Sequence, residues 1–149
     1  SEGDVEIFGA GGTIVESLKS AISATKTDGY IAIMAYLDRK DDAAVAELRA
    51  ILAEKAHHPA TFGWGPRFLH STGQFHKGGQ KNGSFLQITG SFSQDIEIPG
   101  RDFGFETLVS AQALGDGRAL AQRKYPLIRL NLQNRSAGID QIIAAAQTL

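Results

Sequence analysis

The feature that most constrains the fold is an unbroken apolar stretch at residues 30–37, YIAIMAYL. A strand with one face in solvent alternates apolar and polar residues, whereas this stretch is apolar at every position. Turn-forming residues, Asp28 and Gly29 among them, flank it and limit it to the length of a strand. The stretch therefore predicts a strand that is buried on both faces.

Periodicity and turn residues predict strands and helices in alternation around this strand. The expected order is a strand at Val5–Phe8, a helix at 13–25, the strand at 30–37, a helix from Asp41 or Asp42 to about His57, a strand within 61–69, a strand at 84–89, short helices at 105–114 and 116–124, a strand at Leu127–Leu132 and a last helix. Such alternation in 149 residues predicts a single α/β domain, with a mixed sheet of about four or five strands covered by helices.

Capping residues predict where these helices begin and end. Thr13 and Glu16 have the spacing of a capping box, so the first helix should begin there. Gly115 should break the fourth helical segment in two, with Asp116 as the cap of its second part. Ser136 should cap the last helix.

Composition excludes several classes of protein. The net charge is −1, so the chain lacks the overall positive field that would hold nucleic acid or an anionic membrane. It has no cysteine, which excludes disulfides and favours a reducing compartment, so we expect a cytoplasmic protein. No apolar run reaches the roughly 18 residues that a membrane span needs, and the first residues do not resemble a signal peptide.

The distribution of charge is more informative than its sum. Between Lys55 and Gln94 there is no Asp or Glu, whereas the rest of the chain carries all 16 acids. The same window contains all four histidines and several cations, which are His57, His58, His70, His76, Lys55, Arg67, Lys77 and Lys81. The sequence therefore predicts a local positive region that attracts anions, with chance clustering in a solvated loop as the alternative.

The centre of this region is the segment GPRFLHSTGQFHKGG, residues 65–79. Ser71 and Gln74 have the spacing of a capping box, so a short helical turn with free N–H groups is expected there. Arg67 can hold an oxyanion through two N–H groups, and the hydroxyl and amide groups can bind sugar hydroxyls. We therefore predict a site for phosphate or a sugar phosphate. Its expected members are Arg67, His70, Ser71, Thr72, Gly73, Gln74, His76 and Lys77. The alternative is a loop whose polar groups satisfy only its own backbone.

Other motifs support weaker interpretations. Residues 9–13, GAGGT, resemble a dinucleotide loop, but the third glycine of that motif would fall at Ile14, so a flexible entry to a helix is favoured.

The histidines lack neighbouring cysteines and carboxylates, so we expect no metal. His57 and His58 fit a helix C-terminus instead. His70 beside Ser71 is not a catalytic triad, since no acid lies near. Aromatic rings among cations could bind single-stranded nucleic acid, but the charge balance favours none.

The segment 65–79 resembles the motif G-P-R-[FY]-L-H-S-T-G-Q-L-H-K-G-G near the C-terminus of bifunctional transaldolase/glucose-6-phosphate isomerase proteins. The resemblance extends to IAIMAYLDR, FLQIT and IPGRDFGFETLVSAQALGDGRAL, and so covers roughly residues 30–132. Phe75 stands where leucine is usual, and Gln80 where proline is frequent.

The resemblance implies that residues 1–149 are an excised C-terminal domain of a longer enzyme of carbohydrate metabolism, in glycolysis and the pentose phosphate pathway. The chain lacks the Schiff-base lysine barrel of transaldolases and the glutamate-containing motifs of glucose-6-phosphate isomerases. We therefore expect an accessory domain without isomerase activity of its own and without a cofactor, which contacts the other domains. The alternatives are that His70 or His76 acts in the isomerase site of the full-length protein, or that the domain is purely structural or oligomeric.

Overall fold

The apolar stretch forms the interior strand that the sequence predicts. In the computed structural model, which describes residues 1–92 and 94–149, β2 (Tyr30–Tyr36) lies between two parallel neighbours, β3 (Ala60–Trp64) and β4 (Gly83–Gly90). Every residue of β2 after Tyr30 is buried. Because both faces of this strand are covered, its side chains belong to two separate cores.

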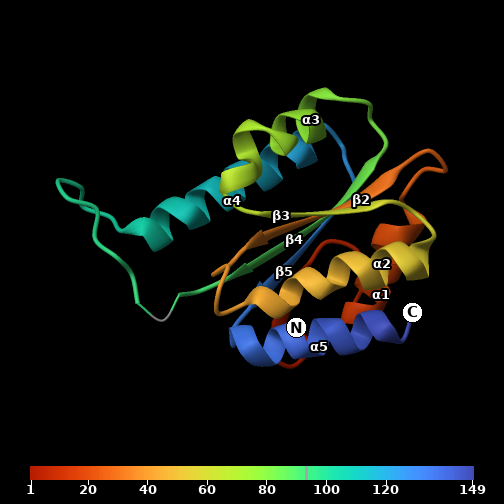
Figure 1. The fold of residues 1–149 in the computed structure, drawn as a ribbon, viewed down its shortest axis with the longest axis horizontal. Coiled ribbons are helices and arrows are strands. Elements are labelled where there is room, and N and C mark those ends of the chain that lie inside the picture. The colour runs from red at the N-terminus through yellow and green to blue at the C-terminus, as the bar shows by residue number, and fades with distance from the viewer. Residues whose placement is uncertain (93) are drawn as a thin grey trace.

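Over residues 1–92 and 94–149, the sheet has five strands in the order β1-β5-β4-β2-β3. β5 (Leu127–Leu132) is parallel to β4 (Figure 1), whereas β1 (Val5–Phe8) runs antiparallel to β5 at one edge. The prediction of a single α/β domain with a mixed sheet of four or five strands is confirmed.

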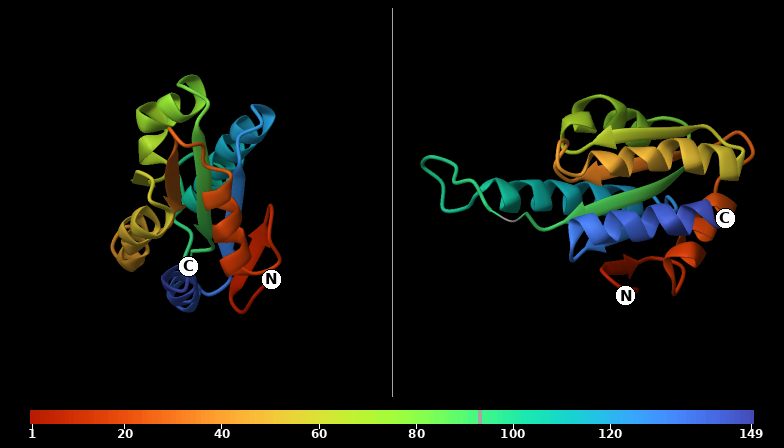
Figure 2. Two further views of the ribbon diagram at one scale, coloured as in Figure 1. Left: turned by 90° about the vertical axis from the view of Figure 1, so that its right-hand side faces the viewer. Right: turned by 60° about the horizontal axis from the view of Figure 1, so that its bottom comes forward.

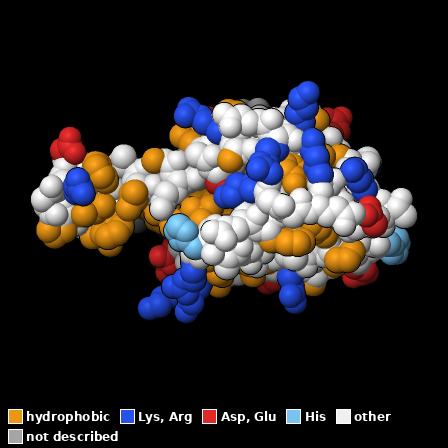
Figure 3. All heavy atoms as spheres, turned by 90° about the horizontal axis from the view of Figure 1, so that it is seen from above, with side chains coloured by type: hydrophobic (Ala, Val, Ile, Leu, Met, Phe, Trp, Pro, Cys, Tyr) orange, Lys and Arg blue, Asp and Glu red, His pale blue; other side chains and the backbone are white. Residues whose placement is uncertain are grey.

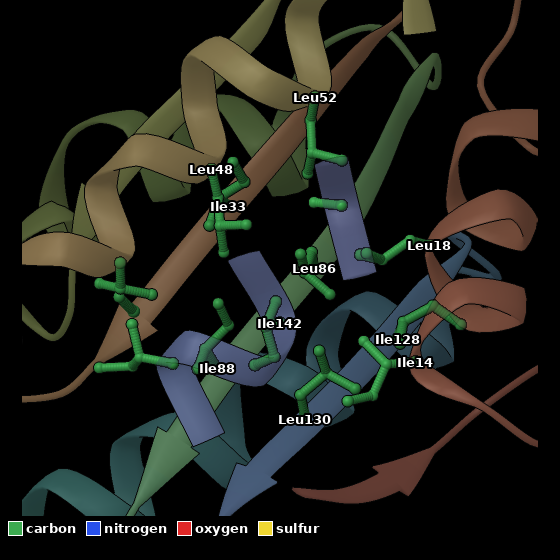
Figure 4. Close-up of a cluster of buried hydrophobic side chains, with 14 of the residues drawn as sticks. Ile14, Leu18, Ile33, Leu48, Leu52, Leu86, Ile88, Ile128, Leu130 and Ile142 are labelled. Atoms are coloured by element: carbon green, nitrogen blue, oxygen red, sulfur yellow. The ribbon is translucent and has the colours of Figure 1, made fainter. Parts of the chain in front are cut away.

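Among the residues that the structure describes, five α-helices cover the two faces of the sheet. α1 (Ile14–Ser23), α2 (Leu48–Ala56) and α5 (Arg135–Gln147) pack on one face. Their leucines and isoleucines meet those of β2, β4 and β5 in the larger core (Figure 4). α3 (Thr72–Gly78) and α4 (Phe105–Gln122) cover the opposite face, above the sheet in Figure 1. Within the described ranges, no helix is long and apolar enough to cross a membrane.

The helix caps agree with the sequence at one end of the chain and differ at the other. Thr13 and Glu16 form the predicted capping box, with the Glu16 N–H 3.2 Å from the Thr13 hydroxyl. α5 is capped by Asn134 rather than Ser136, because Arg135 is already helical and the Ala137 N–H donates to Asn134 Oδ1 at 3.2 Å.

The expected cap of α2 is also different. A 3₁₀ turn, η1 (Ala43–Glu47), precedes this helix, and Asp42 makes no side-chain capping hydrogen bond. Its carboxylate instead accepts from the Asp38 N–H at 2.9 Å and lies 3.3 Å from Arg135 on α5. The Asp42 carboxylate therefore forms a tertiary ion pair with Arg135 and does not form the cap that the sequence predicts for the helix that follows it.

α4 is one helix of 18 residues, so the predicted break at Gly115 is wrong. A glycine in a helix interior costs only about 1 kcal/mol relative to alanine. Ala113 and Leu120 on either side of it are buried against the sheet, and this burial outweighs the cost. Asp116 is consequently a buried residue within the helix rather than a cap.

The first turns of α4 extend beyond the ends of the strands, together with the connection that precedes them (Figure 2). Residues 94–106, called the arm below, form this projection. A bridge between Glu97 and Gly104 and a hydrogen bond of 2.9 Å from the Phe105 N–H to the Ile96 carbonyl fold the arm back on itself.

Candidate functional site

The segment 65–79 directly follows β3, an edge strand of the sheet that runs parallel to β2. It forms a 3₁₀ turn, η2 (Arg67–His70), and then α3, a helix of seven residues on the same face of the sheet as α4. The segment therefore has both a face toward the sheet and a face toward solvent.

The face toward the sheet contains three buried residues of the motif. Phe68, Gly73 and His76 are buried. A Cβ atom at Gly73 would lie 3.2 Å from the Phe68 carbonyl oxygen, and one at Gly65 would lie 2.5 Å from the Tyr36 ring. These two glycines are therefore explained by close packing within the domain and not by the approach of a ligand.

His76 lies in an aromatic environment under α3. Its ring centroid is 5.9 Å from that of Tyr30, 6.1 Å from that of Phe68 and 5.1 Å from that of Phe85. Neither ring nitrogen has a hydrogen-bond partner among the described residues. Burial lowers the pKa of His76, although the nearby Asp116 carboxylate acts in the opposite direction. The expectation that His76 shares one polar surface with Arg67 is thus wrong, because His76 faces the core, and Gly73 is buried as well.

Five polar members of the predicted site are exposed to solvent, and Phe75 in the same segment is 56% exposed. The exposed predicted members are Arg67, His70, Ser71, Thr72 and Gln74. Figure 3 views the molecule from the side of α3 and α4, and Lys and Arg side chains are spread over this side.

The predicted capping box of α3 does not form. The Ser71 hydroxyl donates to the Phe68 carbonyl at 3.2 Å, and the Gln74 N–H donates to the Ser71 carbonyl instead of the hydroxyl. The backbone of Ser71 has φ −133° and ψ −97°, outside the extended conformation of a capping residue. The polar side chains of this face, rather than a capped helix start, are therefore what a ligand would meet.

Lys77 connects α3 to α4 and to the central strand. Its Nζ lies 2.5 Å from Asp116 Oδ1, and the Tyr36 hydroxyl donates to Asp116 Oδ2 at 3.2 Å. Arg123 of α4 also donates to the Lys77 carbonyl. Burial, and then the Asp116 carboxylate, raise the pKa of Tyr36. Lys77 is therefore partly neutralised by its own domain, which reduces its use as an anion ligand.

Asp116 is the residue of this region that sequence reasoning missed. Its spacing from Ala113 and Leu120, three and four residues, places it on the apolar face of α4. A charged residue on an apolar helix face predicts a buried partner of opposite charge, and this was the available signal. The glycines on both sides of Asp116, Gly115 and Gly117, pointed to a helix end instead, because closely spaced glycines are typical of the end of a helix.

The weaker motifs have structural explanations. The N–H groups of Gly12 and Thr13 donate to the Glu16 carboxylate at 2.8 and 3.1 Å, and that of Ile14 donates to Glu2. Two carboxylates thus occupy the start of α1, where a dinucleotide phosphate would have to bind. His57 ends α2 in the left-handed conformation, with φ 53°. Within residues 1–92 and 94–149, no three His, Cys, Asp or Glu side chains are grouped as metal ligands.

Comparisons with known proteins give a fold but no family. No family model matches the chain, and no curated protein matches it. A solved structure, that of the hypothetical protein TT0462 from Thermus thermophilus, matches with a TM-score of 0.70 and 19% sequence identity. The match covers 89% of this chain and 38% of the Thermus chain, so the same fold occurs there as part of a longer protein.

Proposed function

We propose that the chain is an accessory domain of a bifunctional transaldolase/glucose-6-phosphate isomerase, and that the exposed face of residues 65–79 binds phosphate or a sugar phosphate. The observation that carries this proposal is the exposed set of Arg67, His70, Ser71, Thr72 and Gln74. It lies at the carboxyl end of β3 in a window of 40 residues without an acid.

Each exposed side chain has a distinct part in this proposal. Arg67 would supply the fixed charge and two parallel N–H donors for phosphate oxygens. His70 would add a donor that becomes cationic when it is protonated. The hydroxyls and the Gln74 amide would bind sugar hydroxyl groups. Lys77 would mainly hold α3 in place, since its ammonium group already contacts Asp116.

The domain by itself would not isomerise a sugar phosphate. That reaction needs a base that removes a proton from carbon, and the exposed face of the segment contains no carboxylate. The nearby Asp116 is buried and bound by Tyr36 and Lys77. If the segment contributes an acid or base to a site of the full-length, cytoplasmic enzyme, His70 is the candidate, because His76 lies in the core.

Calorimetric titration with inorganic phosphate and with fructose 6-phosphate tests the proposal. A charge-assisted hydrogen bond is worth about 1.5–3 kcal/mol, so Arg67→Ala should weaken binding at least about tenfold. Arg49→Ala on α2 is a matched control, because it removes an exposed arginine from the opposite face of the sheet. Absence of binding at millimolar ligand, or equal losses in the two variants, would contradict the proposal.

A further inference from the structure

The arm presents apolar side chains to solvent in a defined shape. Ile96 is 65% exposed, Phe103 38% and Phe105 48%. Hydrogen bonds within the arm, including one of 2.8 Å from the Glu106 N–H to Asp95, hold its two sides together. The orange side chains on the projection in Figure 3 show this concentration. A projecting apolar surface of this kind is typical of a contact with another protein.

A groove on the face of the sheet that α3 and α4 cover presents two further exposed apolar side chains. It runs between α4 and the edge formed by β5 and β1, as two adjoining hollows of about 260 and 420 Å³. Phe8, 44% exposed, and Leu114, 43% exposed, line both hollows. Among the described residues, the arm and this groove hold five of the six exposed large hydrophobic side chains, and Phe75 is the sixth.

The two surfaces carry opposite charge. The arm contains four acids and one base, which are Asp95, Glu97, Asp102, Glu106 and Arg101. The residues that line the groove include Arg118 and Arg129 and no acid. Arg129 is held in place by the Phe8 ring, with its guanidinium carbon 4.0 Å from the ring centroid. An apolar, acidic projection thus matches an apolar, basic groove.

We propose that the arm of one chain binds in the groove of a second copy, so that two chains form a twofold symmetric dimer. The arm does not reach its own groove: Phe105 and Leu114 lie nine residues apart on one helix, a separation of about 13 Å along its axis. Both surfaces include parts of α4, so an antiparallel pair of α4 helices brings each arm to the partner's groove. Such an interface is closed and self-complementary, which limits the assembly to two chains.

Sedimentation velocity over a concentration series, without phosphate, tests the dimer. The chain should change from monomer to dimer as its concentration rises. Phe105→Asp should weaken the dimer at least about thirtyfold, since loss of a central aromatic contact typically costs about 2 kcal/mol or more. Phe75→Asp is the matched control, because it places the same charge at a similarly exposed phenylalanine on α3, and it should leave the dimer unchanged.

A charge exchange tests the assigned partner surfaces. Arg118→Glu and Glu97→Lys should each weaken the dimer, and the double variant should recover part of the loss, because the charges are then opposite again. Both substitutions are at exposed side chains, so circular dichroism should show an intact fold for each variant. A chain that stays monomeric up to about millimolar concentration, as expected if another protein covers the arm, would overturn the proposal. A dimer insensitive to Phe105→Asp, or a double variant no tighter than the single ones, would do so as well.

Discussion

The replacement of His76 by phenylalanine should stabilise the domain and change its response to pH. Both ring nitrogens are buried without a partner among the described residues, and each such group costs about 1–3 kcal/mol. A phenyl ring retains the packing against Tyr30, Phe68 and Phe85. We therefore expect the free energy of unfolding of His76→Phe at pH 8 to exceed that of the natural sequence by about 1 kcal/mol or more.

The pH dependence follows from the direction of the pKa shift. The folded state lowers the pKa of His76, because burial disfavours the imidazolium more than the Asp116 carboxylate favours it, and Lys77 opposes the charge as well. The free energy of unfolding is therefore highest, with respect to this proton, above the unfolded pKa of about 6.5, and it decreases as the pH falls from there toward the folded value. Because a single proton is involved, the free energy of unfolding changes by at most about 1.4 kcal/mol per pH unit.

Urea denaturation at pH 8 and at pH 5.5 measures both effects. The natural sequence should lose stability between the two values, and His76→Phe should lose less, by up to about 1.4 kcal/mol. His70→Phe is the control, because it removes an exposed histidine from the same segment. An equal loss for the natural sequence and His76→Phe would refute the assignment of this proton to the buried ring.

The other predictions concern helix packing and caps. Lys77→Met should lower the free energy of unfolding by about 1–3 kcal/mol in urea titrations, because it leaves a buried carboxylate with one partner fewer. Gly115→Ala should raise the melting temperature through a gain of up to about 1 kcal/mol, since nothing lies within 4 Å of the added methyl group. Gly65→Ala should lower it, because the methyl group would lie 2.5 Å from a tyrosine ring. Asn134→Ala should cost about 1 kcal/mol in chemical denaturation and Ser136→Ala much less, and the reverse order would contradict the observed cap of α5.

The sequence predicts the strands and most helices because their signals are local. The apolar stretch of β2 can be buried only by neighbours on both faces, and the alternation of LIRLNL fixes which side of β5 faces the core. Thr13 and Glu16 lie on one helical turn, so their reciprocal hydrogen bonds need no tertiary partner.

The candidate site was predicted only in part. The residue types and the absence of acids are properties of the sequence, and they identify residues 65–79 as a basic polar segment. The division of that segment into an exposed face and a buried face depends on how α3 lies against the sheet. The sequence assigns His76 and Gly73 to the site because residue types alone do not show which side of a helix faces the sheet. In the packed helix, both residues are buried.

Local patterns along the chain were thus sufficient for the α/β architecture, the interior position of β2, the capping box of α1 and the acid-free basic window. Packing of the helices on the sheet was needed to make α4 continuous, to bury Asp116 with Lys77 and Tyr36, and to pair Asp42 with Arg135 in place of its expected cap. The difference lies in the range of the interactions. Periodicity and capping act within one or two turns of the chain, whereas the ion pairs that redirected Asp42 and Asp116 join residues many positions apart, and these exist only once the helices have packed on the sheet.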